Sequence, residues 1–97
     1  QRSHRQAVGY LEKSAEIWQR RKDWFNYAMT RQNLAVAHRG TGDYKQAQIY
    51  FEQVRELAVK NSFGELETMS LQGLASLYQA RGEHKQAIEL LQKALGQ

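Results

Sequence analysis

A fifteen-residue stretch of this chain occurs twice, forty positions apart. Residues 33–47 read Asn-Leu-Ala-Val-Ala-His-Arg-Gly-Thr-Gly-Asp-Tyr-Lys-Gln-Ala, and residues 73–87 read Gly-Leu-Ala-Ser-Leu-Tyr-Gln-Ala-Arg-Gly-Glu-His-Lys-Gln-Ala. The identical pairs are Leu34/Leu74, Ala35/Ala75, Gly42/Gly82, Lys45/Lys85, Gln46/Gln86 and Ala47/Ala87. A fixed internal period of this size is typical of stacked-repeat architectures. An ordinary helical bundle needs no such recurrence, so the repetition predicts an all-α solenoid.

Apolar residues recur at helical spacing in five segments, and no segment alternates as a strand would. In the first segment the residues at this spacing are Ala7, Tyr10, Leu11, Ser14, Ile17 and Trp18, which predicts one largely apolar stripe. Candidate N-caps are Ser3, Asp23, Asp43, Ser62 and Glu83, with Ser62 and Glu65 spaced as a capping box. Gly40, Gly42 and Gly82 are placed to end helices. The short connections predict that consecutive helices lie antiparallel.

Small and large residues recur at matching positions of the two copies. Ala35, Ala47, Ala75 and Ala87 are predicted to lie where helices cross closely. Tyr44, Phe51, Tyr78 and Leu91 are their predicted large partners. Trp18 and Trp24 flank the first turn, where they are predicted to pack between the first two helices; a partner hot spot is the alternative.

Composition limits the function classes. Ninety-seven residues make a single domain, residues 1–97. The absence of cysteine excludes disulfides and thiolate metal sites and fits a reducing, cytoplasmic location. The N-terminus has no signal-peptide pattern and no initiator Met, which predicts a piece of a longer chain. No apolar run approaches the roughly 20 residues that span a bilayer.

The positive charge is uneven along the chain. Residues 1–48 carry nine Lys or Arg against four Asp or Glu, whereas residues 49–97 carry five against six. The one tight basic cluster, Arg20-Arg21-Lys22, ends a predicted helix, where cations complement the helix dipole. Direct nucleic-acid binding through the basic half is therefore the weakest alternative, because no aromatic-interleaved basic stripe accompanies the cluster.

The recurring pattern Leu-Ala-x-x-[His/Tyr]-x3-Gly-[Asp/Glu]-[Tyr/His]-x-x-Ala resembles the tetratricopeptide repeat. On that register one unit runs from Ala28 and the next from Thr68. The resemblance implies that residues 3–22 are the second helix of a partial repeat, that 24–60 and 63–96 are repeats, and that the stack is a right-handed superhelix segment. The period departs from the family's 34 residues, and the usual proline after the second helix is missing. The period of forty exceeds the family's by six residues, which correspond to about 9 Å of helix. A stack also exposes apolar surface wherever a neighbour is missing, which predicts a possible homo-oligomer through the end helices.

The resemblance further implies a protein or peptide partner on the concave face. By family geometry the groove positions are Met29, Gln32, Asn33, Val36 and Arg39, then Met69, Gln72, Gly73, Ser76 and Gln79. Amides can donate and accept hydrogen bonds together, which suits a peptide backbone, and Met side chains adapt their shape. The Lys and Asn with which some members bind a terminal carboxylate are absent, and Arg39 is alternatively placed to cap helix carbonyls.

No pattern of residues indicates catalysis, a cofactor or a metal. The histidines are His4, His38 and His84; the last two fall at predicted packing positions, and none forms a metalloprotease-type pair. The leading interpretation is a non-enzymatic interaction scaffold. The alternative is the sensor or oligomerisation segment of a larger bacterial regulator, such as a transcription factor or signalling protein.

Overall fold

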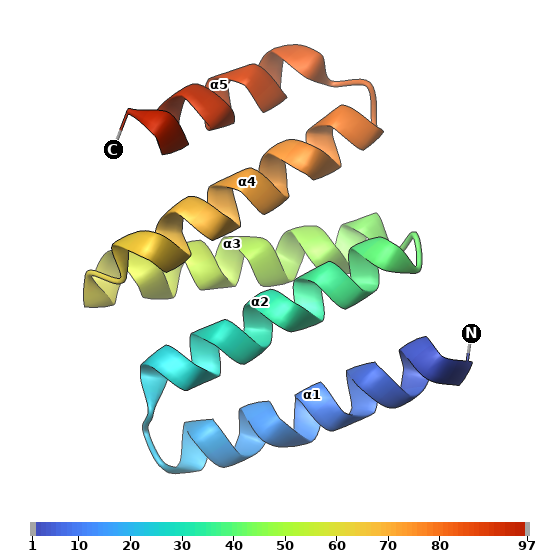
Figure 1. Cartoon of the computed structure of the whole chain (residues 1–97), viewed down its shortest axis with the longest axis vertical. Coiled ribbons are helices and arrows are strands. Elements are labelled where there is room, and N and C mark those ends of the chain that lie inside the picture. Colours follow the sequence, from blue (N-terminus) through green and yellow to red (C-terminus); the bar gives the residue numbers. More distant parts are fainter. Residues whose placement is uncertain (1, 97) are drawn as a thin grey trace.

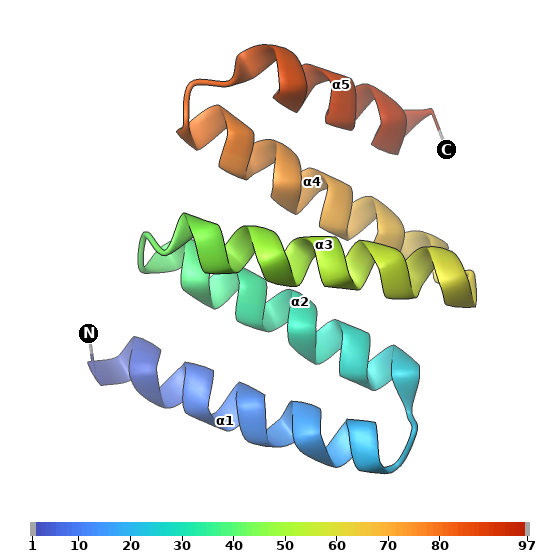
Figure 2. The same ribbon diagram turned by 180° about the vertical axis from the view of Figure 1, so that it is seen from behind.

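Five helices stack side by side in a computed structural model that describes residues 2–96, with side chains for 3–96. They are α1 (Arg2–Arg20), α2 (Trp24–Gly40), α3 (Tyr44–Asn61), α4 (Gly64–Ala80) and α5 (His84–Leu95). Each helix packs against the next, and α2 also contacts α4. The helix α3 lies behind α2 and α4 in Figure 1 and in front of them in Figure 2. The predicted all-α helical repeat is confirmed, and no strand occurs between residues 2 and 96.

The four turns share one geometry that recurs every twenty residues. The residues Lys22, Gly42, Ser62 and Gly82 all have positive φ. The residue after each of them donates its backbone N–H to a carbonyl five positions earlier; the pairs are Asp23–Trp18, Asp43–His38, Phe63–Ala58 and Glu83–Tyr78, at 2.8 to 3.0 Å. These bonds satisfy carbonyls that a helix end leaves free. The forty-residue sequence period is therefore two helix-and-turn units of twenty residues each.

The start of each helix confirms two predicted caps and corrects two others. The carboxylates of Asp23 and Asp43 accept from the backbone N–H three residues later, at 3.2 Å each. The Asn26 side chain also donates to Asp23, and these hydrogen bonds hold the pKa of the Asp23 carboxyl below its usual range. The predicted capping box of Ser62 is wrong, because Ser62 occupies the left-handed position that ends α3, and Phe63 precedes α4.

Of the two other predicted helix starts, Ser3 differs from the structure and Glu83 agrees with it. The helix α1 already begins at Arg2, so Ser3 lies inside it. Glu83 occupies the position before α5 but makes no capping hydrogen bond with its side chain. Its carboxylate instead lies 4.0 Å from Arg81. Backbone turn geometry thus defines the last two helix starts without help from a side chain.

The predicted small residues lie in the core. Ala35, Ala47, Ala75 and Ala87 are all buried. One cluster joins α2, α3 and α4 and contains Leu34, Ala35, Ala47, Tyr50, Phe51, Leu74 and Leu77. The residues Val8 and Leu11 of α1 pack against it. A second cluster lies near the α3–α4 turn and contains Ala28, Val54, Ala58 and Leu66.

The predicted apolar stripe of α1 is only partly buried, and three of its members are exposed. Tyr10 is 73% exposed and Ile17 is 46% exposed, and Ala7 is exposed as well. Their equivalents forty residues later include Tyr50, which is 8% exposed, and Ala47, which is fully buried. The difference arises because α3 packs between α2 and α4, whereas α1 contacts only α2. A helix with two neighbours buries more of such a stripe than a helix with one.

The remaining aromatic and basic residues near the turns lie close to the surface. The guanidinium of Arg21 lies over the Trp18 ring, 5.7 Å from its centre, and Trp24 packs edge-on against Tyr27. Arg20 pairs with Glu16 at 3.6 Å on an exposed part of α1. His84 is exposed, which corrects its prediction as a packing residue. None of the helices between residues 2 and 96 has the length and apolar character needed to cross a membrane.

Candidate interaction face

The side of the stack on which α2 and α4 lie next to each other brings the predicted groove residues together; we call it the α2/α4 face (Figure 1). Two hydrogen bonds join the two helices there, and one aromatic contact joins α2 to the residue before α4. The Gln32 amide donates to the Met69 carbonyl at 3.3 Å, and Arg39 donates to the Ser76 hydroxyl at 2.6 Å. Where α2 and α4 begin, the rings of Phe25 and Phe63 pack edge to face, with centroids 5.3 Å apart. These contacts fix the register of α2 against α4.

The hydrogen bonds change the roles of two predicted ligand contacts. Gln32 is only 5% exposed, so its side chain is part of the α2–α4 junction rather than a free surface amide. Its Oε1 atom is buried without a hydrogen-bond partner. Arg39 does not cap helix carbonyls, because it reaches across to Ser76 and lies over the Phe51 ring.

Phe51 forms the floor under this junction. It is fully buried on α3 and is a member of the central cluster. A Cβ atom added to Gly73 would lie 2.5 Å from Cζ of Phe51 and 2.6 Å from Cδ1, so the ring occupies the space that a side chain would need. Gly73, predicted as a groove position, is therefore a buried packing site. The corresponding positions forty residues earlier hold Leu11 and Asn33.

The other predicted residues divide by exposure. Asn33, Val36, Gln72 and Gln79 are exposed, whereas Met29, Arg39, Met69 and Ser76 are half-buried. Both Met side chains pack against the second core cluster. Sequence reasoning missed Phe25, which is 47% exposed, and its neighbour Phe63. Phe25 could have been found, because it lies one helical turn before Met29 on the same side of α2.

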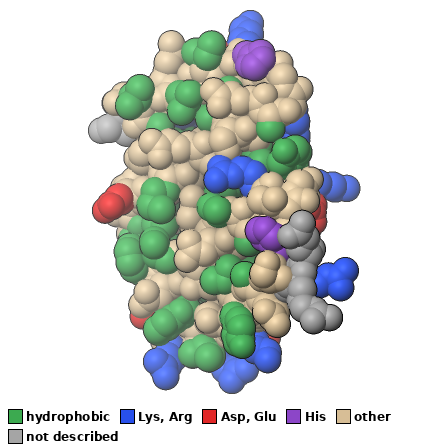
Figure 3. Space-filling view, turned by 45° about the vertical axis from the view of Figure 1, so that its right-hand side comes forward, with side chains coloured by type: hydrophobic (Ala, Val, Ile, Leu, Met, Phe, Trp, Pro, Cys, Tyr) green, Lys and Arg blue, Asp and Glu red, His purple; other side chains and the backbone are tan. Residues whose placement is uncertain are grey.

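The charged residues of α2 and α4 are few and are separated along the two helices. The α2 segment contains Arg31 and Arg39 but no Asp or Glu, and the acidic residues of α4 are Glu65 and Glu67 in its first turn. The space-filling view shows many hydrophobic side chains toward its left and few acidic ones (Figure 3). The surface thus combines apolar contact area with the cationic side chain of Arg39, whereas Arg31 lies over the rings of Tyr27 and Tyr50.

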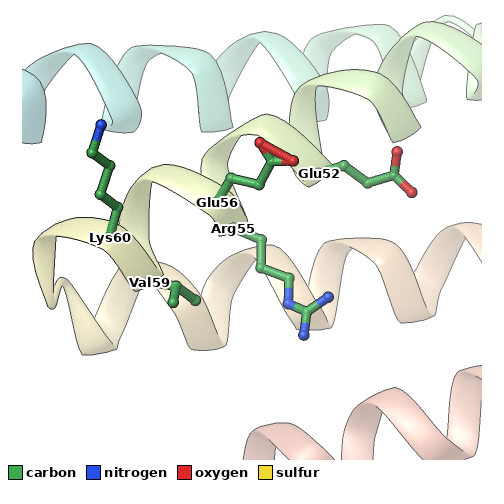
Figure 4. A pocket seen from close by; sticks show the side chains of 5 residues that line it. All are labelled: Glu52, Arg55, Glu56, Val59 and Lys60. Carbon is green, nitrogen blue, oxygen red and sulfur yellow. The ribbon is translucent and has the colours of Figure 1, made fainter.

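One surface cavity lies away from the α2/α4 face and is lined mainly by charged residues. It measures about 490 Å³ and is lined by Glu52, Arg55, Glu56, Val59 and Lys60. Figure 4 shows that all five side chains come from α3 and that Arg55 and Lys60 point in opposite directions. Charges of both signs on a single exposed helix face are typical of a solvated surface.

The histidines belong to no metal-binding cluster of three or more His, Cys, Asp or Glu among the residues that the structure describes. His4 and His38 line a shallow cavity of about 340 Å³. The His38 ring stacks on Tyr50 with centroids 5.4 Å apart, and its Nδ1 lies 3.7 Å from the Asp43 carboxylate. The contacts of His38 are those of a packing residue.

Comparison with known families gives two matches. A tetratricopeptide repeat model matches residues 1–60, and a second tetratricopeptide repeat model matches residues 70–97. No curated protein and no solved structure gives a significant match. The first match alone covers more than half of the chain.

Proposed function

Because this chain belongs to the tetratricopeptide repeat family, whose members generally mediate protein–protein interactions and are typically non-enzymatic, we propose that it binds a peptide segment or helix of a partner protein on the α2/α4 face. The observation that carries the proposal is the pair of hydrogen bonds from Gln32 and Arg39, which hold the two helices in register. A preset surface costs less ordering free energy on binding than a mobile one.

The exposed side chains of this face match the needs of a peptide ligand. Asn33 and Gln72 can each donate and accept hydrogen bonds with a peptide backbone. Val36 lies about one helical turn after Asn33 on α2. It is 42% exposed and offers apolar contact. The half-buried Met29 and Met69 can change rotamer to follow the shape of the ligand. Partners of several shapes could therefore bind to the same set of side chains.

A charge placed on this face should abolish binding without unfolding the protein. Peptides selected from a displayed random library against the 97-residue chain would be measured by fluorescence anisotropy against Val36→Glu. We expect the affinity to fall at least about tenfold, because the bound peptide would have to desolvate a carboxylate, which costs more than the roughly 1.4 kcal/mol that a tenfold change requires.

The matched control is Val59→Glu, which makes the same substitution at an exposed position of α3. Both variants should keep wild-type stability to within about 0.5 kcal/mol, as surface substitutions usually do. Equal loss of affinity in the two variants, or no loss in either, would place the ligand elsewhere and refute the proposal.

Self-association is a second candidate function, and it would fit an oligomerisation segment of a larger regulator. It is favoured by the exposed apolar residues of the end helices: Tyr10 and Ile17 on α1, and Ile88 and Leu95 on α5. On α3 the position equivalent to Tyr10 is covered by neighbouring helices. A second copy could supply the missing cover at either end.

Molar mass measured by light scattering over a concentration series tests this candidate. If copies associate through α1, the mass should rise with concentration, and Tyr10→Glu with Ile17→Glu should keep the protein monomeric because the carboxylates would have to be desolvated. Val59→Glu serves again as the control and should not alter the series. A constant monomer mass for the unmodified chain would remove self-association as a function.

A further inference from the structure

We infer that the partner segment carries an apolar anchor and, farther along, a carboxylate that pairs with Arg39. The inference rests on the proposed function, since it concerns the same α2/α4 face. It names the chemistry of the ligand from the uneven distribution of apolar and charged side chains along this face.

The anchor end lies where α2 and α4 both begin. Phe25 and Phe63 pack edge to face there, and Phe25 keeps 47% of its surface exposed. Met29 and Met69 lie beside them and pack on the core beneath. Two aromatic rings and two adaptable Met side chains form a surface that an aromatic or aliphatic side chain of a ligand can cover.

The opposite end carries an arginine without an acidic partner. Arg39 is half-buried and donates through Nη1 to the neutral Ser76 hydroxyl. Of the ion pairs among the described residues, none involves Arg39. Its remaining N–H groups can donate to a carboxylate in a bidentate pair, which is stronger than a hydrogen bond to a neutral group. The nearest acidic residues of α4, Glu65 and Glu67, lie in its first turn, toward the anchor end.

The length of α2 sets the spacing of the two ligand groups. Phe25 and Arg39 are fourteen residues apart on one helix, which corresponds to about 21 Å at 1.5 Å per residue. An extended peptide covers that distance with about six residues at 3.3 Å each. A helical ligand lying parallel or antiparallel to α2 would need about fourteen.

To test the inference, 16-residue peptides that bind the 97-residue chain would be selected from a displayed random library. The affinity of a synthetic peptide with their consensus sequence would then be measured by fluorescence anisotropy. We expect the selected peptides to combine an aromatic, Leu or Met residue with Asp or Glu about six or about fourteen positions away. Arg39→Gln should weaken binding roughly tenfold, because a charge-assisted hydrogen bond is lost. Binding to the unmodified chain should also weaken when salt is raised.

Two controls separate this effect from general changes in charge or fold. Arg55→Gln removes the same charge from α3 and should leave the affinity unchanged. Ser76→Ala removes the internal bond of Arg39 but keeps the cation, so it measures how much affinity depends on the register of α2 against α4; a loss as large as that of Arg39→Gln would overturn the inference. Thermal melts of all three variants show whether each one is folded.

The outcomes distinguish the inference from the function on which it rests. Peptides without an acidic preference that bind Arg39→Gln normally, but lose affinity with Val36→Glu, would overturn the inference and leave the proposed function standing. Peptides that bind Val36→Glu as tightly as the unmodified chain would overturn both. Loss of affinity with Arg39→Gln and Arg55→Gln alike would show a nonspecific charge effect and would also overturn the inference.

Discussion

Gly73→Ala is expected to lower the free energy of unfolding by about 1–3 kcal/mol, the usual cost of overpacking a core. The change would ordinarily favour a helix, because glycine in a helix interior is less stable than alanine by roughly 0.5–1 kcal/mol. Here the new methyl group would overlap the Phe51 ring, which is itself fully buried and has little room to move. Urea denaturation followed by circular dichroism measures the difference.

Two comparisons test whether overlap with the Phe51 ring causes the loss of stability. Gly9→Ala makes the same substitution in α1, where an added Cβ meets nothing within 4 Å, and it should stabilise the protein. In a Phe51→Leu background, which shortens the opposing side chain, the cost of Gly73→Ala should shrink. If Gly73→Ala instead stabilises as Gly9→Ala does, the ring can move aside and the close contact carries no energetic cost.

Ala47→Leu is expected to destabilise the protein by a similar amount, about 1–3 kcal/mol. Ala47 is fully buried where α3 crosses its neighbours, in the cluster that includes Leu34, Ala35 and Phe51. A leucine there must push the helices apart or adopt an unfavourable rotamer. Thermal melting and urea denaturation both report the change.

The same substitution forty residues earlier provides the control. Ala7 is the repeat equivalent of Ala47, yet it is exposed on α1. Ala7→Leu should therefore change stability by less than about 0.5 kcal/mol, as surface substitutions do. Equal effects at the two positions would mean that α1 is buried in solution, for instance by a second copy, or that the helix crossing at Ala47 is loose.

Much of the fold was predictable because its determinants are local. Periodic apolar residues, the capping carboxylates of Asp23 and Asp43, and the glycines at positions 42 and 82 each act within one or two turns of helix. The buried Ala35 and Ala47 were predictable as well, since their repetition at one period indicated close crossings. Ser62 was misread, because the residue type favours a cap and gives no sign of a left-handed backbone conformation.

The candidate face was only partly predictable, because its side chains depend on contacts between repeats. Gln32 is buried by a bond to Met69, and its repeat equivalent Gln72 is exposed, although the two residues are identical. The pairing of Phe51 with Gly73 likewise joins residues on different repeats. Periodicity indicates which residues share a helix face, but it does not determine which face meets the neighbouring helix.

The arrangement in which each helix contacts its neighbours along the chain has a consequence for folding kinetics. Apart from the contact between α2 and α4, no two helices distant in sequence touch among residues 2–96. Contacts close in sequence need little loop closure, and proteins dominated by them fold in microseconds to milliseconds. The outer helices α1 and α5 are each held by one partner, so transient opening should begin at the ends. Amides at the centres of α2, α3 and α4, which each contact at least two other helices, should then exchange with solvent last.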